Sequence, residues 1–306
     1  MDAGRRQEKL LIVGSVAFDS VETPAGKVAM ALGGSASYAS IAASYWCRPL
    51  AVGVVGEDFR QRHFQPFVDH GVDVLGVQKV PGKTFHWRGR YHDDFKGRDT
   101  LETALNVFES FDPQIPDEYR QAKYVFLGNI DPGLQSKVLD QTDNAELVAM
   151  DTMNLWIDIA RDGLLDVLRR VDLLFINDEE AIQLTGSSSI VGAAETVLRM
   201  GPRFLVIKRG EYGALLFGPD TRLFVPAVLL DRVVDPTGAG DSFAGGFMGH
   251  VAGAGSLDRN TLASALIDGA VIASFCVEAF SVDGICGVDE SRFAERRVQL
   301  ERMIRL

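Results

Sequence analysis

Short apolar runs recur along the chain, and each ends at glycine or at polar residues. Runs of roughly four to eight residues are typical of strands buried on both faces of a parallel sheet. They occupy residues 10–15, 50–55, 124–129, 147–151, 173–177 and 204–210, and 214–217 follows as a hairpin partner. Segments that predict helices separate or follow them, at 59–70, 261–276 and 292–306. The alternation predicts a three-layer α/β/α fold with a doubly wound, mostly parallel sheet.

Two segments depart from this rhythm. Residues 20–32 place the turn signal Pro24-Ala25-Gly26 between β-branched residues, which predicts a small hairpin. Residues 84–108 alternate aromatic and basic side chains, pass a polar turn and return as a second strand over 103–108. We interpret the second segment as an inserted lid or a subunit contact outside the main sheet. Without a linker-like segment or a repeat, the sequence predicts one domain, 1–306, with this insert.

The stretch 235–248 reads Asp-Pro-Thr-Gly-Ala-Gly-Asp-Ser-Phe-Ala-Gly-Gly-Phe-Met and follows an apolar run, 224–234. This order predicts a strand, a tight turn and a helix, with Gly238-Ala239-Gly240 at the helix mouth. Unpaired N–H groups and the helix dipole make such a mouth a site for anions. Asp241 follows directly. It is either a first-turn residue that complements the dipole or a group with a chemical role.

Polar residues and glycines also follow other predicted strands, where open parallel sheets bind ligands. Asp19 follows the first strand and is either a turn residue or a ligand-binding carboxylate. Gly33 and Gly34 precede an Ala-rich helix, and paired glycines allow either a compact polar ligand or close helix packing. Asp151 and Asn177 end two later strands.

Composition limits the kinds of partner that the chain can bind. Of its 306 residues, 46% are hydrophobic and 24% charged, as in soluble globular proteins. The net charge of −11 argues against binding to nucleic acid or to an acidic membrane surface. Three scattered cysteines without a paired motif favour a reducing compartment. With no long apolar run and a polar start, we expect a cytoplasmic protein that does not enter membranes.

Together these segments resemble the ribokinase-like (PfkB) family of carbohydrate kinases over nearly the whole chain. The stretch 235–248 is similar to the carboxyl-terminal signature of that family. Four further motifs occur in order, at Gly33-Gly34-Ser35-Ala36 (Gly-Gly), 52–58 (G-x-V-G-x-D), 177–180 (N-x-x-E) and 208–214 (a strand ending in G-x-x-G-A), and 14–19 is similar to the first-strand segment. The ordered set is far more specific than any single motif.

The resemblance implies transfer of the γ-phosphoryl group of ATP, with Mg²⁺, to a hydroxyl of a small sugar or sugar-like substrate. Asp241 would act as general base, and the N–H groups of Gly238, Ala239 and Gly240 would neutralise the transferring phosphoryl group. A nucleoside kinase for adenosine, guanosine or inosine is the alternative. A non-catalytic sugar-binding regulator is the third hypothesis, which the intact Asp241 disfavours.

The same resemblance assigns further residues. On the acceptor side these are Asp19, Gly33, Gly34, Ser35 and, with a spacing that differs by one residue, Asn154. On the nucleotide side they are Asn177, Lys208, Gly210, Thr237, Gly238 and Gly240. Asn177 and Glu180 would hold Mg²⁺ through water, although Glu180 could also be a solvated first-turn residue. The resemblance also implies that 20–32 and 84–108 together form the β lid, which would provide a homodimer contact.

Two departures from the family pattern affect these expectations. Lys208 and Arg209 stand where many relatives place Thr, and Lys208 would either contact ATP phosphates or be an ordinary strand-end charge. Residues 274–287 lack the small Gly-Ala turn near the monovalent-cation site of many relatives, so the sequence does not predict potassium dependence.

Overall fold

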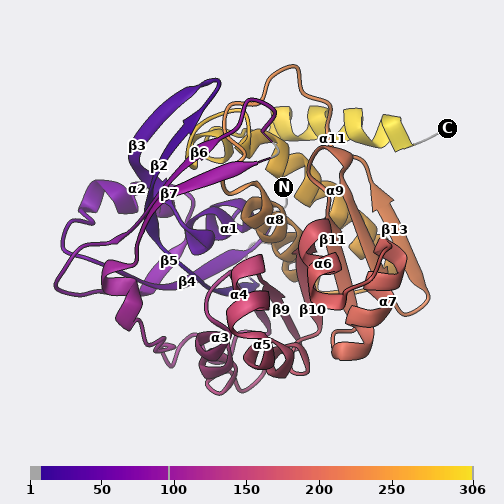
Figure 1. Cartoon of the computed structure of the whole chain (residues 1–306), viewed down its shortest axis with the longest axis horizontal. Helices are drawn as coiled ribbons and strands as arrows, with labels where there is room; N and C mark the ends of the chain where they lie inside the picture. Colours follow the sequence, from indigo (N-terminus) through magenta and orange to yellow (C-terminus); the bar gives the residue numbers. More distant parts are fainter. Residues whose placement is uncertain (1–7, 96, 305–306) are drawn as a thin grey trace.

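The computed structural model describes residues 8–95 and 97–304 of the chain. A nine-stranded sheet forms its centre, in the order β13-β12-β11-β10-β9-β8-β1-β4-β5 (Figure 1). The strands are β1 (Lys9–Val13), β4 (Arg48–Val55), β5 (Asp73–Lys79), β8 (Tyr124–Leu127), β9 (Leu147–Asp151), β10 (Leu173–Asn177), β11 (Phe204–Lys208), β12 (Ala214–Gly218) and β13 (Thr221–Val225). Neighbours pair in parallel from β5 to β11, and β12 and β13 add an antiparallel edge.

Helices cover both faces of this sheet. Successive strand residues point to opposite sides, so each apolar strand contributes side chains to both faces. Leu10 and Ile12 of β1 join a core with α1 (Ser35–Ala43), α2 (Gln61–Asp69), α8 (Ala239–Ala254), α9 (Arg259–Cys276), α10 (Asp283–Cys286) and α11 (Glu290–Ile304). Leu11 and Val13 join the opposite core with α3 (Pro132–Leu139), α4 (Asn154–Ile159), α5 (Arg161–Leu168), α6 (Asp178–Thr185) and α7 (Ile190–Met200). The predicted three-layer, doubly wound architecture is therefore confirmed.

The order of the strands also locates the place where a ligand can bind. From β1 the chain adds β4 and β5 on one side, and β8 to β13 follow on the other. The direction of winding thus reverses between β1 and β8, and open sheets bind ligands beyond the carboxyl ends of the strands at such a point. The structure describes no helix with the length and apolar character of a membrane crossing.

A second sheet of four strands projects from one side of the body, in the order β3-β2-β6-β7 (Figure 1). It consists of β2 (Ala17–Thr23), β3 (Gly26–Gly33), β6 (Phe85–Tyr91) and β7 (Arg98–Ala104). The hairpin predicted within 20–32 is present. The strand predicted at 103–108 is wrong, because β7 ends at Ala104 and the 3-10 helix η2 (Asn106–Ser110) follows. There Val107 is buried in the main core and Phe108 stacks on Phe111, so these apolar residues pack inward.

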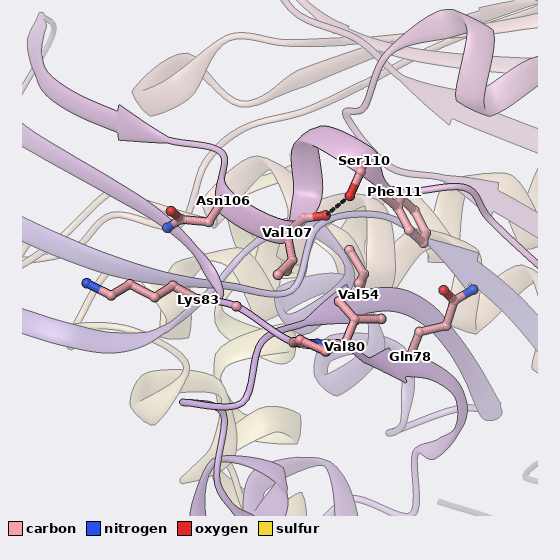
Figure 2. A pocket seen from close by; sticks show the side chains of 10 residues that line it. Val54, Gln78, Val80, Lys83, Asn106, Val107, Ser110 and Phe111 are labelled. Carbon is pink, nitrogen blue, oxygen red and sulfur yellow. Dashed lines mark hydrogen bonds between the residues drawn. The ribbon is translucent and has the colours of Figure 1, made fainter.

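The base of this second sheet, which we call the lid, is fastened to the end of β4. The Thr84 N–H and hydroxyl both donate to Asp58 Oδ1, at 2.8 and 2.6 Å, and the Gly56 N–H donates to Thr84 Oγ1. A cavity of about 460 Å³ opens beside these contacts, between Val54, Lys83 and η2 (Figure 2). Asp58, in the G-x-V-G-x-D motif, therefore anchors the lid.

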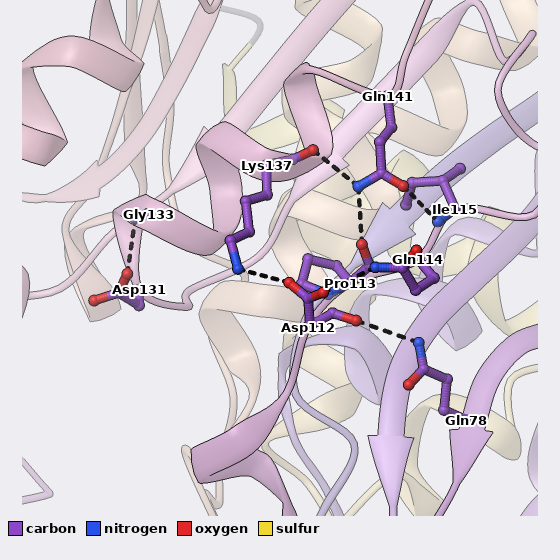
Figure 3. A network of polar contacts seen from close by, with 9 residues as sticks. All are labelled: Gln78, Asp112, Pro113, Gln114, Ile115, Asp131, Gly133, Lys137 and Gln141. Carbon is purple, nitrogen blue, oxygen red and sulfur yellow. Dashed lines mark hydrogen bonds and ion pairs between the residues drawn. The ribbon is translucent and has the colours of Figure 1, made fainter.

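A polar network fastens the chain where it returns from the lid to the body (Figure 3). Lys137 of α3 lies 2.6 Å from Asp112 Oδ1, and Gln141 donates to the Pro113 carbonyl at 2.8 Å. The Ile115 N–H donates to Gln141 Oε1 at 3.0 Å. These contacts hold the returning end of the lid insert against α3, whereas Asp58 and Thr84 hold the other end.

The strand predicted at 224–234 is also wrong. β13 ends at Val225, and residues 226–238 form no strand before α8 begins at Ala239. Pro226 lacks the N–H that a further ladder bond would need. Val228 and Leu230 nevertheless pack on the core below, which explains the apolar composition of this segment.

Candidate active site

Asp241 lies in the first turn of α8, directly behind the turn that opens the helix. The Ala239 N–H donates to the Pro236 carbonyl at 3.2 Å, which leaves the N–H groups of Gly238 and Gly240 as candidates for an anion. Burial raises the pKa of Asp241 to about 7; the charge of Asp151 adds to this rise, and Lys208 opposes it. A carboxylate with this pKa exchanges a proton near neutral pH.

The helix mouth has its shape because Gly238 adopts a left-handed conformation, with φ of 76°. A Cβ at this position would collide with the ring of Tyr38 from α1. Tyr38 is buried, and its hydroxyl has no hydrogen-bond partner among the described residues. Gly238 is therefore required for both its backbone conformation and its contact with the neighbouring ring.

Asp19 lies on β2 of the lid and not, as expected, at the end of a main-sheet strand or in the loop beyond it. Its carboxylate lies against Gly33, where a Cβ would collide with Asp19 Oδ2. Burial raises the pKa of Asp19 to about 7, and the charges of Asp235 and Asp241 add to the rise. The Gly-Gly motif thus makes room for a carboxylate that faces the start of α8.

Lys208, at the end of β11, forms an ion pair with Asp151 at the end of β9, with Nζ 2.5 Å from Oδ2. A Cβ on Gly240 would lie 3.1 Å from the same Nζ, so the ammonium group lies beside the helix mouth. Although burial lowers the pKa of Lys208, the carboxylates of Asp151 and Glu180 outweigh it and raise the pKa above its ordinary value. The ammonium therefore stays charged where an anion would bind.

Asn177 and Glu180 form a capping box at the start of α6. The Glu180 N–H donates to Asn177 Oδ1 at 2.7 Å, and the Asn177 N–H donates to Glu180 Oε2 at 3.0 Å. Burial raises the pKa of Glu180, and the charge of Lys208 opposes the rise. The side chain of Glu180 is buried and belongs to the same charged group as Lys208. The solvated first-turn alternative for Glu180 is therefore wrong.

A magnesium ion fits this region only with water or phosphate among its ligands. The described residues contain no group of three or more His, Cys, Asp or Glu side chains arranged to hold a metal ion. Mg²⁺ keeps several waters and binds through one or two carboxylates plus substrate phosphates. Glu180 supplies a carboxylate of this kind. Its carboxylate accepts from the backbone of Asn177 and of Asn154, which leaves further lone pairs for the waters of the ion.

Of the remaining predicted residues, two form hydrogen bonds and two are exposed. The Thr237 hydroxyl donates to the hydroxyl of Tyr91 in the lid at 3.2 Å. The Ser35 hydroxyl is engaged with Ser15 at the end of β1, accepting from its N–H at 3.2 Å. Asn154 is exposed at the start of α4, and Gly210 is exposed with φ of 52°.

The structure also brings Arg98 of β7 close to the site, which the sequence did not predict. Its charge lowers the pKa of both Asp19 and Asp241, against the larger effect of burial. In the sequence Arg98 stands in a polar segment, 96–99, that looks like an ordinary turn. Only the register of β6 and β7 gives it this position.

The sequence is similar to a known protein family over most of its length. The family described as "pfkB family carbohydrate kinase" matches residues 1–285. The chain belongs to the PfkB family. A cytidine kinase of Thermococcus kodakarensis is 33% identical to it over 246 residues, which cover 78% of this chain and 87% of that protein.

Solved structures agree on the fold of this PfkB-family chain. The nucleoside kinase of Methanocaldococcus jannaschii superposes with a TM-score of 0.76 at 19% identity, covering 96% of this chain and 99% of that one. A protein from E. coli, classed as a ribokinase II and solved with ATP and Mg²⁺, gives a TM-score of 0.77 at 17% identity, with the same coverage. The family match makes the chain a kinase of the PfkB family, and the superpositions show that it has the ribokinase fold.

Proposed function

We propose that this chain transfers the γ-phosphoryl group of ATP to a hydroxyl of a small acceptor, with Asp241 as general base. The observation that carries the proposal is a carboxylate with a pKa of about 7 beside the helix mouth of Gly238 and Gly240. A base of this pKa accepts a hydroxyl proton efficiently near neutral pH, an effect typically worth about 10²–10⁴-fold. Because a carboxylate repels phosphate, Asp241 would not itself bind the anion at this site.

In the proposed step, the acceptor oxygen attacks the γ-phosphorus while its proton passes to Asp241. A new P–O bond forms, the bond from the γ-phosphorus to the β–γ bridging oxygen breaks, and the electron pair leaves on ADP. The N–H groups of Gly238 and Gly240 and the ammonium of Lys208 stabilise the charge on the transferring oxygens.

The nucleotide side of the site would involve Asn177, Lys208, Gly210 and Thr237 at the ends of β10 and β11 and before α8. Mg²⁺ bound with ATP would supply further charge neutralisation, with Glu180 and Asn177 holding its waters. Lys208 supports this assignment best, because its charged end lies beside Gly240.

We propose a nucleoside as the acceptor, with its ribose hydroxyls bonded to Asp19 and its base against Trp87. Asp19 and Trp87 are partners on the neighbouring strands β2 and β6, so their side chains share one face of the lid. Gly33, Gly34, Ser35 and Asn154 would surround the ribose. The similarity to a cytidine kinase supports this choice. A free sugar is the second candidate, because the family match is to carbohydrate kinases.

An ATP-consumption screen over nucleosides and free sugars tests the acceptor. We expect turnover with at least one nucleoside, and we expect Trp87→Ala to raise its KM about tenfold or more, since stacking on an aromatic ring contributes roughly 1–3 kcal/mol per base. Phe224→Ala, at an exposed aromatic residue of β13, is the control. Turnover with sugars alone would rule out a nucleoside as the acceptor but leave the assignment as a kinase in place. Tight binding of a sugar without ATP consumption would favour the non-catalytic regulator.

Three further expectations complete the proposal. The lid would form the contact of a homodimer, since Leu101 of β7 and Met30 of β3 expose large apolar side chains on it. The acidic net charge of −11 favours small-molecule partners over nucleic acid or membrane surfaces. The scattered cysteines, all of them free, suit the cytoplasm.

A further inference from the structure

The lid carries a cation, Arg98, next to the contact between the lid and the helix mouth. Arg98 begins β7 and is the strand partner of Tyr91 on β6. The hydroxyl of Tyr91 accepts the hydrogen bond from Thr237, which immediately precedes Gly238. Arg98 is therefore on the part of the lid that lies next to the turn before α8.

Arg98 also shares the face of the lid that carries Asp19. Its guanidinium carbon lies 5.7 Å from the centre of the Trp87 ring. The ring extends across Gly89, where a Cβ would collide with it. Because Trp87 is the strand partner of Asp19, the arginine, the indole and the carboxylate line one surface. That surface faces Asp241, whose charge raises the pKa of Asp19.

Two neighbouring arginines of the same hairpin have different surroundings. Arg90 NH2 lies 3.1 Å from Glu22 Oε2, and Arg88 Nε lies 3.8 Å from Glu102 Oε2. Arg98 has no carboxylate within 4 Å among residues 8–95 and 97–304. Arg98 is exposed, and although its side chain hydrogen-bonds that of Tyr91, the guanidinium keeps further N–H donors for a ligand.

The distribution of charge at the site favours an anionic ligand for Arg98. Lys208 is already paired with Asp151, so its charge is partly used. The charge of Arg98 lowers the pKa of both Asp19 and Asp241, so this cation is near both the acceptor carboxylate and the candidate base. A nucleotide phosphate entering among these carboxylates needs a further cation, and the planar guanidinium binds phosphate oxygens through two parallel N–H donors.

We propose that Arg98 is a catalytic residue of the lid that donates hydrogen bonds to the transferring phosphoryl group, an inference that rests on the proposed function. Arg98 forms no covalent bond in the step. Its N–H groups bind the non-bridging oxygens of the γ-phosphoryl group while the proton of the acceptor passes to Asp241 and the electron pair leaves on ADP. Its contribution is therefore greatest in the transition state, when the charge on these oxygens changes.

Steady-state kinetics of Arg98→Ala, with Arg90→Ala as the matched control, tests the kinetic consequence. We expect Arg98→Ala to lower kcat about 100-fold or more, as for removal of a transition-state donor, with the KM of the acceptor changed less than about threefold. Arg90→Ala should stay within about twofold of the wild type. Arg98→Gln keeps an unbranched polar side chain, although a shorter one, and removes the charge. A raised KM with unchanged kcat, or normal activity of Arg98→Gln, would overturn the proposal.

Calorimetry with ADP, Mg²⁺ and aluminium fluoride supplies a readout that does not depend on turnover. Aluminium fluoride mimics the transferring phosphoryl group, so the wild type and Arg90→Ala should bind ADP more tightly when it is present. Arg98→Ala should bind ADP normally and lose this gain. An equal gain in ADP affinity in all three proteins would contradict the role of Arg98 and leave the proposed kinase activity untouched. If none of them bound ADP, the kinase proposal would fail together with it.

Discussion

Two carboxylates near the opposite ends of helix α8, Asp241 of α8 itself and Asp268 of the neighbouring α9, have opposite surroundings. Near its carboxyl end, His250 Nδ1 lies 2.6 Å from Asp268 Oδ2, and Arg297 donates to Asp268 Oδ1 at 2.5 Å. At its amino end, Asp241 has no ion-pair partner among the described residues, and the nearby Lys208 is held by Asp151. One carboxylate has both oxygens satisfied, whereas the other remains available.

This difference separates a structural charge from a reactive one. A buried carboxylate with a partner on each oxygen fixes the packing of α8, α9 and α11 and has no capacity left for a substrate. A carboxylate that is buried without such partners binds a proton more tightly, which is the property a general base needs. The same helix thus serves both stability and, in our proposal, chemistry.

Asp241→Asn should produce the largest effect on activity. We expect kcat to fall about 10²–10⁴-fold, because the amide cannot accept the hydroxyl proton, while the midpoint of urea unfolding stays unchanged or rises. Asp162→Asn, in the first turn of α5, is the matched control for loss of a first-turn carboxylate. Near-normal turnover of Asp241→Asn would remove the general-base assignment.

Asp268→Asn should show the reverse pattern. The substitution leaves His250 and Arg297 without their shared partner. Loss of one partner of a buried ion pair typically lowers the free energy of unfolding by about 3–5 kcal/mol. We expect a loss of this size in urea unfolding, with kcat of the remaining folded protein near normal. Glu195→Gln, in the exposed pair with Arg222, should change stability by less than about 1 kcal/mol. A stable but inactive Asp268→Asn protein would contradict the division of roles.

Gly238→Ala and Gly255→Ala compare the two ends of α8 directly, since both glycines are left-handed, with φ of 76° and 65°. A Cβ at Gly255 would make only an ordinary contact, 4.0 Å from the hydroxyl oxygen of Tyr124, so for Gly255→Ala we expect only the conformational cost of roughly 1–2 kcal/mol. Gly238→Ala adds the collision with Tyr38 and should lose more stability and also activity. Equal effects of the two changes would argue against a tightly shaped helix mouth.

Activity should rise with pH around 7, because the raised pKa of Asp241 is about 7 and the base must be deprotonated. Lys208→Met removes a charge that lowers this pKa, so the rising limb of kcat/KM should move to higher pH. Lys137→Met, in the surface pair with Asp112, should leave the limb in place. If the rising limb of kcat/KM did not move in Lys208→Met, a group other than Asp241 would be responsible for it.

The same groups predict how stability depends on pH. Folding raises the pKa of Asp19 and Asp241 from the ordinary 3.8 to about 7, so the folded protein binds more protons than the unfolded chain between these values. Their contribution therefore makes the free energy of unfolding fall as pH rises from about 4 to about 7. Asp19→Asn should weaken this dependence. Urea unfolding at a series of pH values measures it, and an unchanged slope in Asp19→Asn would contradict it.

Features with a local signal could be predicted from the sequence. Apolar runs marked the parallel strands, and small residues before Asp241 marked the start of α8. The strand at 224–234 failed because an apolar segment packs on the core as well in a loop as in a strand. The strand at 103–108 failed because buried Val107 and Phe108 resemble strand residues while forming a 3-10 helix.

Features that depend on distant contacts could not be predicted. Lys208 and Asp151 are 57 residues apart, and only the neighbouring order of β9, β10 and β11 brings their ends together. Arg98 acquires its position through the register of β6 and β7. The cluster of Asp268 joins three helices, and none of its residues stands in a recognisable motif. The roles of such charged residues can be recognised only when the burial and the contacts of each residue are known.

Carbon-13 NMR of the side-chain carboxyl groups tests the central claim most directly, because it follows each titration without requiring an acceptor. The account predicts two aspartate resonances that titrate near pH 7 in the wild type, with one lost in Asp241→Asn and the other in Asp19→Asn. If every aspartate of the wild type titrated below about pH 5, Asp241 would be an ordinary first-turn carboxylate, and the contrast between the two ends of α8 would be contradicted.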